Sequence, residues 1–292
     1  MIKASSLIPR SFFEQLDELL YELAPSNWVH TIKNQAGDGQ LDGYFEDLKI
    51  ANSSISSLHE LSPASIPFSF TISEIEEEDW VNSYKKHFHA WEFKGIHIIP
   101  VWQKGIHKID SEKKALYLDP SMAFGTGNHE TTKMCVESLI TLKQSYEEKI
   151  CSLLDVGCGS GILTLLGDVL SININLGIDT DSNSIKVAYD NLLLNNLNTP
   201  EFQVKGIEEL ELTRLYDVVI ANIQADILCA NVTKLYSCIA ESGHLILSGI
   251  LKNEVDEVQK VFVSQANSFR SKIRFKKRHL NEWSTIHISK ES

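Results

Sequence analysis

The stretch Asp155-Val156-Gly157-Cys158-Gly159-Ser160-Gly161 decides the fold of this chain. It follows a short apolar run, Ser152–Leu154, and precedes the apolar segment Ile162–Leu170, which is long enough to form a helix. Glycine loops between a buried strand and a helix bind ligands at the carboxyl ends of parallel strands, because glycine lets the backbone approach a ligand closely. The stretch therefore predicts an α/β sheet with a ligand site at its edge.

The spacing of the glycines distinguishes two kinds of ligand. A dinucleotide-binding loop reads G-x-G-x-x-G/A, whereas Gly157, Gly159 and Gly161 give G-x-G-x-G, with Ile162 at the place of a later glycine. Asp155 stands just before the loop, and a carboxylate suits a cationic ligand better than a phosphate. We therefore expect these residues to bind S-adenosylmethionine, which carries a sulfonium and an ammonium group; a glycine-rich turn without a ligand is the weaker alternative.

Strands alternate with helices from Ile150 onward. A helix is predicted over Ser182–Asn195, and apolar strands are predicted over Asn173–Ile178, Phe202–Val204, Asp217–Ala221 and His244–Ser248. Near-continuous apolar strands of this kind are typical of a parallel sheet covered on both faces. Lys272–Phe275 and Thr285–Ile288 are expected to close the sheet as an antiparallel C-terminal hairpin. The fold class is therefore α/β, with a Rossmann-like, mostly parallel sheet.

The first 75 residues have a different pattern. An amphipathic helix is predicted over Ser11–Leu23, and strands over Trp28–Ile32, Leu41–Phe45 and near Phe68–Ile72. This order suits a small α+β domain over residues 1–75, ahead of the Rossmann-like domain.

Residues 76–113 are expected to join the two domains, so that the Rossmann-like domain covers residues 114–292. The acidic and aromatic segment 74–92 is interpreted as a helical connector whose aromatic side chains pack on a neighbour. Ile96–Val101 and Lys114–Leu118 are interpreted as a hairpin that leads into the second domain.

Composition and charge restrict the cellular location and the partners. No apolar run approaches the roughly 20 residues that span a bilayer, and the first residues lack a signal peptide's apolar stretch. Five irregularly spaced cysteines indicate free thiols, so we expect a cytoplasmic protein without membrane contact. The net charge is −12, and residues 1–80 hold 14 acidic against 4 basic side chains. This acidity either serves solubility or docks a basic partner, and it disfavours nucleic acid.

Two polar residues end later strands of the predicted sheet. Asp179 follows Leu176-Gly177-Ile178, where a carboxylate can accept hydrogen bonds from both hydroxyls of a ribose, whereas Asp181 is expected to cap the next helix. Asn222 follows Tyr216–Ala221, and its amide carbonyl could hold an amine substrate or the cofactor. The alternative for Asn222 is an ordinary turn asparagine.

A loop rich in glycine and threonine precedes the sheet. It runs from Asp119 through Phe124, Gly125, Thr126 and His129 to a helix that is expected to begin near Thr131. A loop with glycines and an exposed phenylalanine is costly to order, which indicates a lid over a ligand. His129 has no second His or Cys at ligand spacing, so no metal is expected.

These segments together resemble the bacterial ribosomal protein L11 methyltransferase family (PrmA). The specific part is Ala123-Phe124-Gly125-Thr126-Gly127-x-His129-x-Thr131-Thr132; the Asp155 loop, Asp179 and Ala221-Asn222-Ile223 agree with it. Smaller matches are Glu78-Asp79-Trp80, His87-Phe88, Ser248-Gly249-Ile250-Leu251 and Glu282-Trp283. The resemblance covers the chain from about residue 77 to the C-terminus, and the first 75 residues match only in size and rough pattern.

The resemblance implies a class I methyltransferase fold, a function and a set of site residues. Cofactor contacts are implied for Thr132, Gly157, Asp179 and Asn222, and closure over the cofactor for Phe124, Gly125, Thr126 and His129. The implied reaction is methylation, to the trimethyl state, of the N-terminal α-amine and lysine side chains of a basic large-subunit ribosomal protein. The first 75 residues would recognise that protein. We expect a monomer without direct nucleic-acid binding.

Asn222 is the expected catalytic residue. It would orient the amine, while water takes the proton. Three alternatives stay open: a lysine methyltransferase for another protein, such as an electron-transfer flavoprotein subunit; a nucleic-acid or small-molecule methyltransferase; and a non-catalytic binding module. Adenine methyltransferases carry Asn/Asp-Pro-Pro-aromatic at this strand to stack a flipped base, whereas Ile223-Gln224-Ala225 follow Asn222 here. The basic stretch Arg270–Arg278 could favour nucleic acid, but at strand spacing it more often forms a solvated edge.

Overall fold

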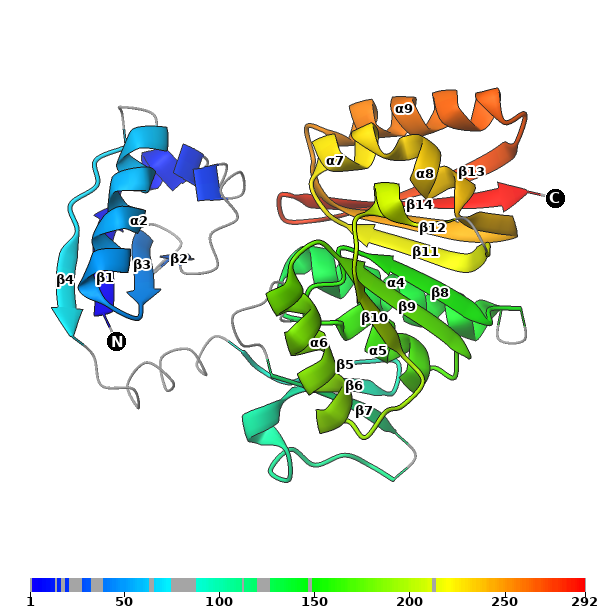
Figure 1. Cartoon of the computed structure of the whole chain (residues 1–292), viewed down its shortest axis with the longest axis horizontal. Helices are drawn as coiled ribbons and strands as arrows, with labels where there is room; N and C mark the ends of the chain where they lie inside the picture. The colour runs from blue at the N-terminus through cyan, green and yellow to red at the C-terminus, as the bar shows by residue number, and fades with distance from the viewer. Residues whose placement is uncertain are drawn as a thin grey trace. The chain divides into compact units, whose positions relative to one another are not determined.

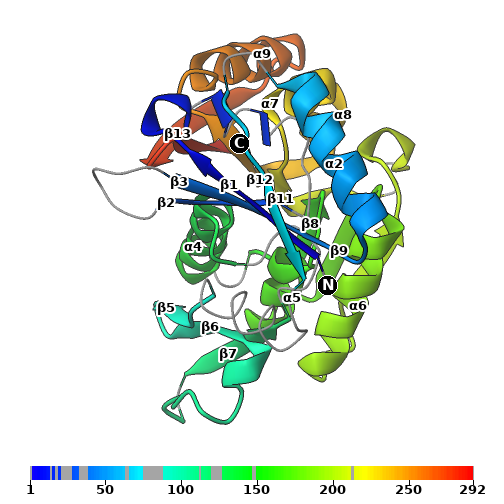
Figure 2. The same cartoon turned by 90° about the vertical axis from the view of Figure 1, so that its left-hand side faces the viewer.

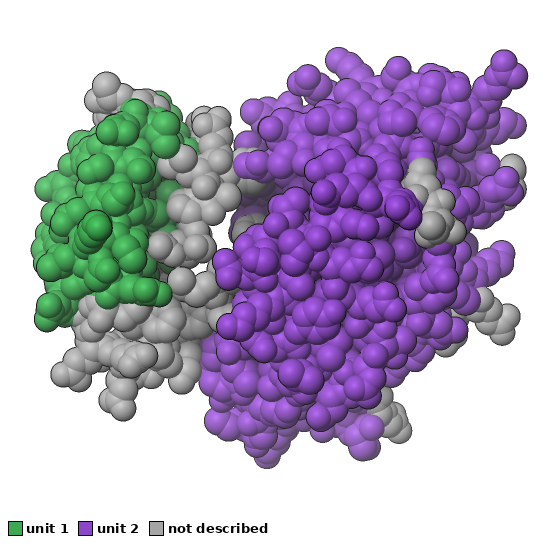
Figure 3. Space-filling model, viewed as in Figure 1, with its two compact units in different colours: residues 1–87 green, residues 88–292 purple. Residues whose placement is uncertain are grey.

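The computed structural model describes residues 2–13, 15–16, 19–20, 28–32, 39–62, 66–74, 88–111, 113–119, 127–146, 149–211 and 214–291. The chain divides into two compact units, residues 1–87 and 88–292 (Figure 3). Residues 88–113 thus belong to the second unit, while the roles expected of residues 1–75 and of a connector over 76–113 stay predictions. Within the described ranges, no helix is long and apolar enough to cross a membrane.

The first unit contains a four-stranded antiparallel sheet of order β2-β3-β1-β4 with the helix α2 packed against it (Figure 2). Buried and exposed residues alternate along β1 and β3, as expected of strands with one covered face. Ala51 and Leu58 of α2 join Leu41, Phe45 and Trp28 in its core. The predicted small α+β arrangement is confirmed. The bounds are β1 Ile2–Ile8, β2 Trp28–Ile32, β3 Gly39–Phe45, α2 Leu48–Leu61 and β4 Thr71–Glu74.

One strand predicted for the first unit needs correction. The strand near Phe68–Ile72 begins later, at Thr71, because the amides of Phe68 and Ser69 bond the Ile66 carbonyl and the Ser6 hydroxyl instead of a neighbouring strand. The helix predicted over Ser11–Leu23 falls partly outside the described residues; it starts as a 3-10 turn at Arg10–Phe12, and its described residues 13, 15–16 and 19–20 are helical, as predicted. Residues 75–87 of the expected helical connector also lie outside the described residues.

The second unit is built on a seven-stranded sheet of order β10-β9-β8-β11-β12-β14-β13 (Figure 1). The first five strands run parallel, and β14 and β13 close the sheet antiparallel, which confirms the predicted class. The strand bounds are β8 Ser152–Val156, β9 Ile174–Asp179, β10 Glu201–Val204, β11 Tyr216–Asn222, β12 Ile239–Leu251, β13 Lys272–Leu280 and β14 Trp283–Glu291.

Helices cover both faces of this sheet (Figure 1). Apolar residues of α4, α5 and α6 pack with Leu153, Val218 and Ile220 on one face, and those of α7, α8 and α9 pack on the other with Leu154 and Val219. Successive residues of β8, and likewise of β11, thus enter the hydrophobic cores on opposite faces of the sheet, which explains why both strands are continuous apolar runs. The helices are α4 Glu130–Ser145, α5 Ile162–Val169, α6 Ser182–Leu194, α7 Ala225–Ala230, α8 Val232–Ser237 and α9 Val255–Ser268.

The predicted hairpin of Ile96–Val101 with Lys114–Leu118 is wrong. These segments form β6 (Ile96–Pro100) and β7 (Lys114–Leu118), which pair parallel, and β6 makes its antiparallel hairpin with β5 (Trp91–Phe93). Lys94 and Gly95 both have positive φ and form the tight turn of that hairpin, so Trp91 lies in a strand and not in the expected helix. Residues between β6 and β7 cross over, which allows the parallel pairing.

Candidate cofactor and substrate site

The site lies where the strand order of the large sheet reverses. From β8 the chain proceeds outward through β9 and β10, and it then returns to add β11 and β12 on the other side of β8. Open α/β sheets bind ligands at the carboxyl ends of the strands at such a point. The glycine loop leaves β8 here, beside the residues that leave β11.

Gly157 and Gly161 explain why the loop needs glycine. Gly157 has φ +70°, and a Cβ there would come 2.4 Å from Cγ2 of Ile223, the residue after β11. Gly161 has φ +79°, and a Cβ there would lie 2.8 Å from the Phe202 ring. Both positions combine a left-handed backbone with a close approach of another segment. The loop is therefore pressed against the ends of β10 and β11.

The amides of the loop are already bonded within the protein. Gly157 and Cys158 donate to the Ile178 carbonyl at 2.9 and 3.0 Å, Gly159 donates to Asp179 at 2.9 Å, and Gly161 donates to the Cys158 carbonyl at 2.9 Å. A phosphate-binding loop offers its amides to the ligand. These four amides are occupied, which agrees with a ligand that carries no pyrophosphate.

Asp179 lies at the carboxyl end of β9, next to the loop. One carboxylate oxygen accepts from the Gly159 amide and the other accepts from the Asp181 amide at 2.9 Å. These bonds fix the side chain and leave lone pairs on both oxygens for further donors. Asp181 caps α6 by accepting from the amides of Asn183 and Ser184, as predicted. These amides, that of Asn183 first, hold the pKa of Asp181 below its usual value.

Asp155 is almost fully buried, with 1% of its surface exposed. Its Oδ2 accepts from the Thr164 hydroxyl at 2.8 Å, whereas Oδ1 has no hydrogen-bond partner among the described residues. Burial above all, with a smaller contribution from the nearby Asp179, raises the pKa of Asp155 to about 7, and the bonds from Thr164 oppose this rise. A buried carboxylate with a free oxygen is suited to a cationic donor.

Asn222 ends β11 and faces the start of α4. Its Nδ2 lies 3.4 Å from the hydroxyl oxygen of Thr132, and its Oδ1 is buried without a partner in the described part of the chain. Unsatisfied buried acceptors are uncommon and need an explanation. A donor group supplied by a ligand at this edge would satisfy Oδ1. The structure thus brings Asn222 together with Thr132, and through Ile223 with Gly157.

His129 caps α4, one residue before the helix begins at Glu130. Its Nδ1 lies 2.8 Å from the Thr131 hydroxyl and 3.4 Å from the Thr131 amide, and its ring packs edge-on against Trp283 at 5.1 Å. Burial lowers the pKa of His129, which favours the neutral ring that can accept these bonds. His129 is thus tied to the helix that carries Thr132. Phe124, Gly125 and Thr126 lie outside the described residues.

Sequence reasoning missed several polar residues near the site. Asn191 of α6 is fully buried; its amide accepts from Asp119 and donates to the carbonyl of Ser160 in the glycine loop. Asn195, four residues on, bonds both backbone groups of Tyr117 in β7. Asn191 and Asn195 are four residues apart and so point to the same side of the helix, and this spacing is the sequence signal that could have indicated both. Asn191 thus connects the glycine loop to Asp119, the residue after β7, and Asn195 holds the end of α6 against β7 itself.

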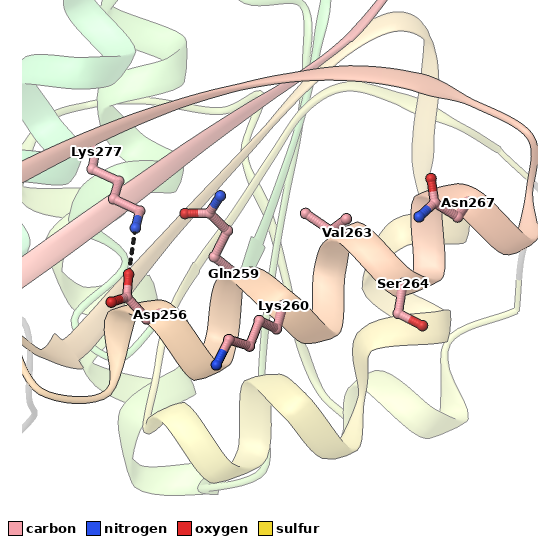
Figure 4. A pocket seen from close by; sticks show the side chains of 7 residues that line it. All are labelled: Asp256, Gln259, Lys260, Val263, Ser264, Asn267 and Lys277. Carbon is pink, nitrogen blue, oxygen red and sulfur yellow. Dashed lines mark hydrogen bonds and ion pairs between the residues drawn. The ribbon is translucent and has the colours of Figure 1, made fainter.

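One hollow of the second unit lies outside this site. A shallow hollow on α9 is lined by Asp256, Gln259, Lys260, Val263, Ser264, Asn267 and Lys277, and it contains none of the expected site residues (Figure 4). All five cysteines are free thiols, as expected. Among the residues with a described position, no group of three or more His, Cys, Asp or Glu side chains could hold a metal ion.

Comparisons with known proteins agree with this arrangement. The crystal structure of a ribosomal protein L11 methylase from Lactobacillus delbrueckii subsp. bulgaricus superposes with a TM-score of 0.60 at 23% identity, over 70% of this chain and all of that one. This likeness shows the fold.

Sequence relatives carry the family assignment. The curated ribosomal protein L11 methyltransferase of Staphylococcus carnosus is 35% identical over 82% of this chain and 75% of its own length, and that of Clostridium botulinum strain Alaska E43 is 32% identical over 83% and 79%. A relative from Caldicellulosiruptor saccharolyticus is 38% identical over 65% of this chain and 61% of its own length.

A family model described as "Ribosomal protein L11 methyltransferase (PrmA)" matches residues 17–291. The match includes the glycine loop, Asp179, Asn222 and the start of α4. The chain therefore belongs to the ribosomal protein L11 methyltransferase family and is a protein methyltransferase that uses S-adenosylmethionine.

Proposed function

We propose that this enzyme methylates amino groups of ribosomal protein L11, namely its N-terminal α-amine and lysine side chains. The observation that carries the proposal is the buried, unpartnered Oδ1 of Asn222 at the carboxyl end of β11. An amine is a hydrogen-bond donor, and a carbonyl oxygen fixed beside the cofactor site can aim its nitrogen. The names of the family and of its relatives supply the identity of the protein substrate.

The cofactor contacts follow from the same edge of the sheet. The two oxygens of Asp179 would accept from the hydroxyls of the cofactor's ribose, and Asp155 would face the cationic end of its amino-acid part. Gly157, Gly159 and Gly161 keep the loop close to the sheet, and Thr132 stands beside Asn222. Phe124, Gly125, Thr126 and His129 would belong to the segment that closes the site.

Bound S-adenosylmethionine supplies an electrophilic methyl group on its sulfonium. The protein's task is to hold a neutral amine in line with that methyl group and to exclude water. Asn222 accepts a hydrogen bond from the amine and leaves the nitrogen lone pair directed at the methyl carbon. The amine nitrogen would form the new bond to the methyl carbon, the sulfur would keep the electron pair of the broken carbon–sulfur bond, and the extra proton would pass to water.

The two kinds of target amine differ in how easily they reach the neutral form. An α-amine has a pKa of about 7.7–8.0 and is partly neutral near pH 7, whereas a lysine near 10.4 must lose its proton on binding. Removing a lysine from water lowers its pKa. We therefore expect methylation of the α-amine to depend less on pH than methylation of lysine.

The acidic first unit suits a basic substrate. Residues 1–80 have 14 acidic and 4 basic side chains, a charge that attracts a basic ribosomal protein and repels nucleic acid. We place the enzyme in the cytoplasm, where such a substrate is made, and we expect it to act as a monomer without direct nucleic-acid binding.

Three substrates offered separately with labelled cofactor test the proposal. Purified L11 should take up label, whereas an electron-transfer flavoprotein subunit and ribosomal RNA should not. Label on the flavoprotein subunit alone would replace the proposal with that of a different lysine methyltransferase. Label on RNA would assign the enzyme to nucleic-acid methylation.

A further inference from the structure

The contacts of Asp155 point to a residue that no family motif contributes. Asp155 pairs in the sheet with Gly177 of β9 and with Ile220 of β11. Neither neighbour has a polar side-chain atom, so the sheet offers no side-chain partner for the carboxylate. The partner comes from α5, where the Thr164 hydroxyl donates to Oδ2 at 2.8 Å.

Thr164 is held against Asp155 by its surroundings. It is fully buried on α5, and its amide, one of the free donors of the first helical turn, also bonds the carboxylate. A Cβ added at Gly177 would come 2.7 Å from the Thr164 hydroxyl oxygen. The absence of a side chain at Gly177 therefore makes room for this hydroxyl.

The arrangement leaves one oxygen of Asp155 for a ligand. Oδ1 is buried and has no partner within the described residues. Such an oxygen needs a hydrogen-bond donor. The α-ammonium of S-adenosylmethionine is a donor with a positive charge, whereas its sulfonium donates nothing, so the ammonium is the group that fits.

We propose that Thr164 is a positioning residue for the cofactor: its hydroxyl orients Asp155, so that Oδ1 receives the cofactor's α-ammonium. The inference rests on the proposed binding of S-adenosylmethionine at this edge. Burial favours the neutral acid at Asp155, and the Thr164 bonds oppose it. Without the hydroxyl, a larger fraction of Asp155 is neutral near pH 7, and a neutral acid attracts an ammonium weakly.

Titration calorimetry with the full chain tests the proposal with S-adenosylmethionine and S-adenosylhomocysteine. Thr164→Val keeps the shape of the side chain and removes the hydroxyl. It should raise both dissociation constants roughly ten- to a hundred-fold near pH 7, which is the loss in affinity expected when one hydrogen bond to a charged group is removed. Both ligands should lose affinity alike, because both carry the ammonium. Thr164→Ser should restore binding.

The pH profile separates this role from a structural one. Between about pH 6 and 7.5, below the ammonium pKa of roughly 8, wild-type affinity should rise with pH as Asp155 ionises. In Thr164→Val this rise should move to higher pH. Asp155→Asn should remove it, and adding Thr164→Val to Asp155→Asn should then change affinity little, because the two residues act as one unit.

Ser152→Ala is the matched control. The Ser152 hydroxyl also donates to a carboxylate, Asp217, at 2.9 Å, but it lies at the opposite end of the same strand, β8. Ser152→Ala should leave both dissociation constants and their pH profile unchanged.

Three results would overturn the inference: Thr164→Val binding both ligands within two-fold of wild type, an unshifted pH profile, or an equal loss in Ser152→Ala. A failure of L11 to accept methyl groups would leave these titrations intact, so the two proposals fail separately.

Discussion

The substitution Gly157→Ala tests the link between the glycine loop and the end of β11. The added Cβ meets two costs: a backbone at φ +70°, and a contact of 2.4 Å with Cγ2 of Ile223. A left-handed conformation costs about 1–2 kcal/mol in a residue with a side chain, and overpacking of one methyl group costs about 1–3 kcal/mol. We expect a loss of about 2–5 kcal/mol in unfolding free energy, or about 4–20 °C in Tm.

Gly105→Ala is the control, because it separates the two costs. Gly105 has φ +82°, and a Cβ there meets nothing within 4 Å. It should therefore lose about 1–2 kcal/mol, the backbone cost alone. Adding Ile223→Ala to Gly157→Ala removes the clashing methyl group and should recover the packing part of the loss.

Thermal unfolding and cofactor titration measure both effects. Gly157→Ala should also weaken S-adenosylmethionine binding, because the loop must move away from Ile223, whereas Gly105→Ala should bind it as wild type does. Equal Tm values and equal affinities for the two alanine variants would refute the reasoning.

Three further substitutions test individual contacts. Asp179→Asn puts a donor opposite the amide of Gly159 or Asp181 and should weaken cofactor binding roughly ten- to a hundred-fold in titration calorimetry; unchanged affinity would remove Asp179 from the site. Asn222→Ala should lower kcat/KM for methyl transfer without a comparable change in Tm, and unchanged kcat and KM would contradict the role of Asn222. Asn231→Ala is the control: it loses a hydrogen bond to the Ile227 carbonyl and should leave methyl transfer unchanged. His287 is half-buried beside His244 and Lys276, and desolvation first of all lowers its pKa from 6.5 to about 4. The unfolded chain therefore binds more protons between these values, and stability should fall by about 2–3 kcal/mol as the pH drops from 6.5 to 4. His287→Gln should flatten that part of the stability profile, and a slope identical to wild type would refute the assignment.

The large sheet could be predicted because its signals are local. Ser152–Val156 and Tyr216–Asn222 are apolar on both faces, the glycine loop joins a strand to a helix, and Asp181 caps the helix that follows. The carboxyl ends of neighbouring parallel strands meet at one edge, so the positions of Asp155, Asp179 and Asn222 could be predicted together.

The rest of the fold depends on distant contacts. The parallel pairing of β6 with β7 follows from packing on α5 and α6, which the pattern of Ile96–Val101 cannot reveal. The role of Thr164 depends on Asp155, nine residues away, and on the space that Gly177 leaves. Asn191 contacts Asp119 across 72 positions in sequence, and a buried asparagine on a helix gives no sign of its partner.

The position of the transferred methyl groups tests the central claim most directly. Purified enzyme, L11 and S-adenosylmethionine with a labelled methyl group would be incubated, and tandem mass spectrometry would locate the label on the product. We predict label on the N-terminal nitrogen and on lysine nitrogens, lost when Asn222 is replaced by alanine. Label on oxygen, sulfur or an arginine side chain, or an L11 without label beside an enzyme that binds the cofactor, would contradict the account.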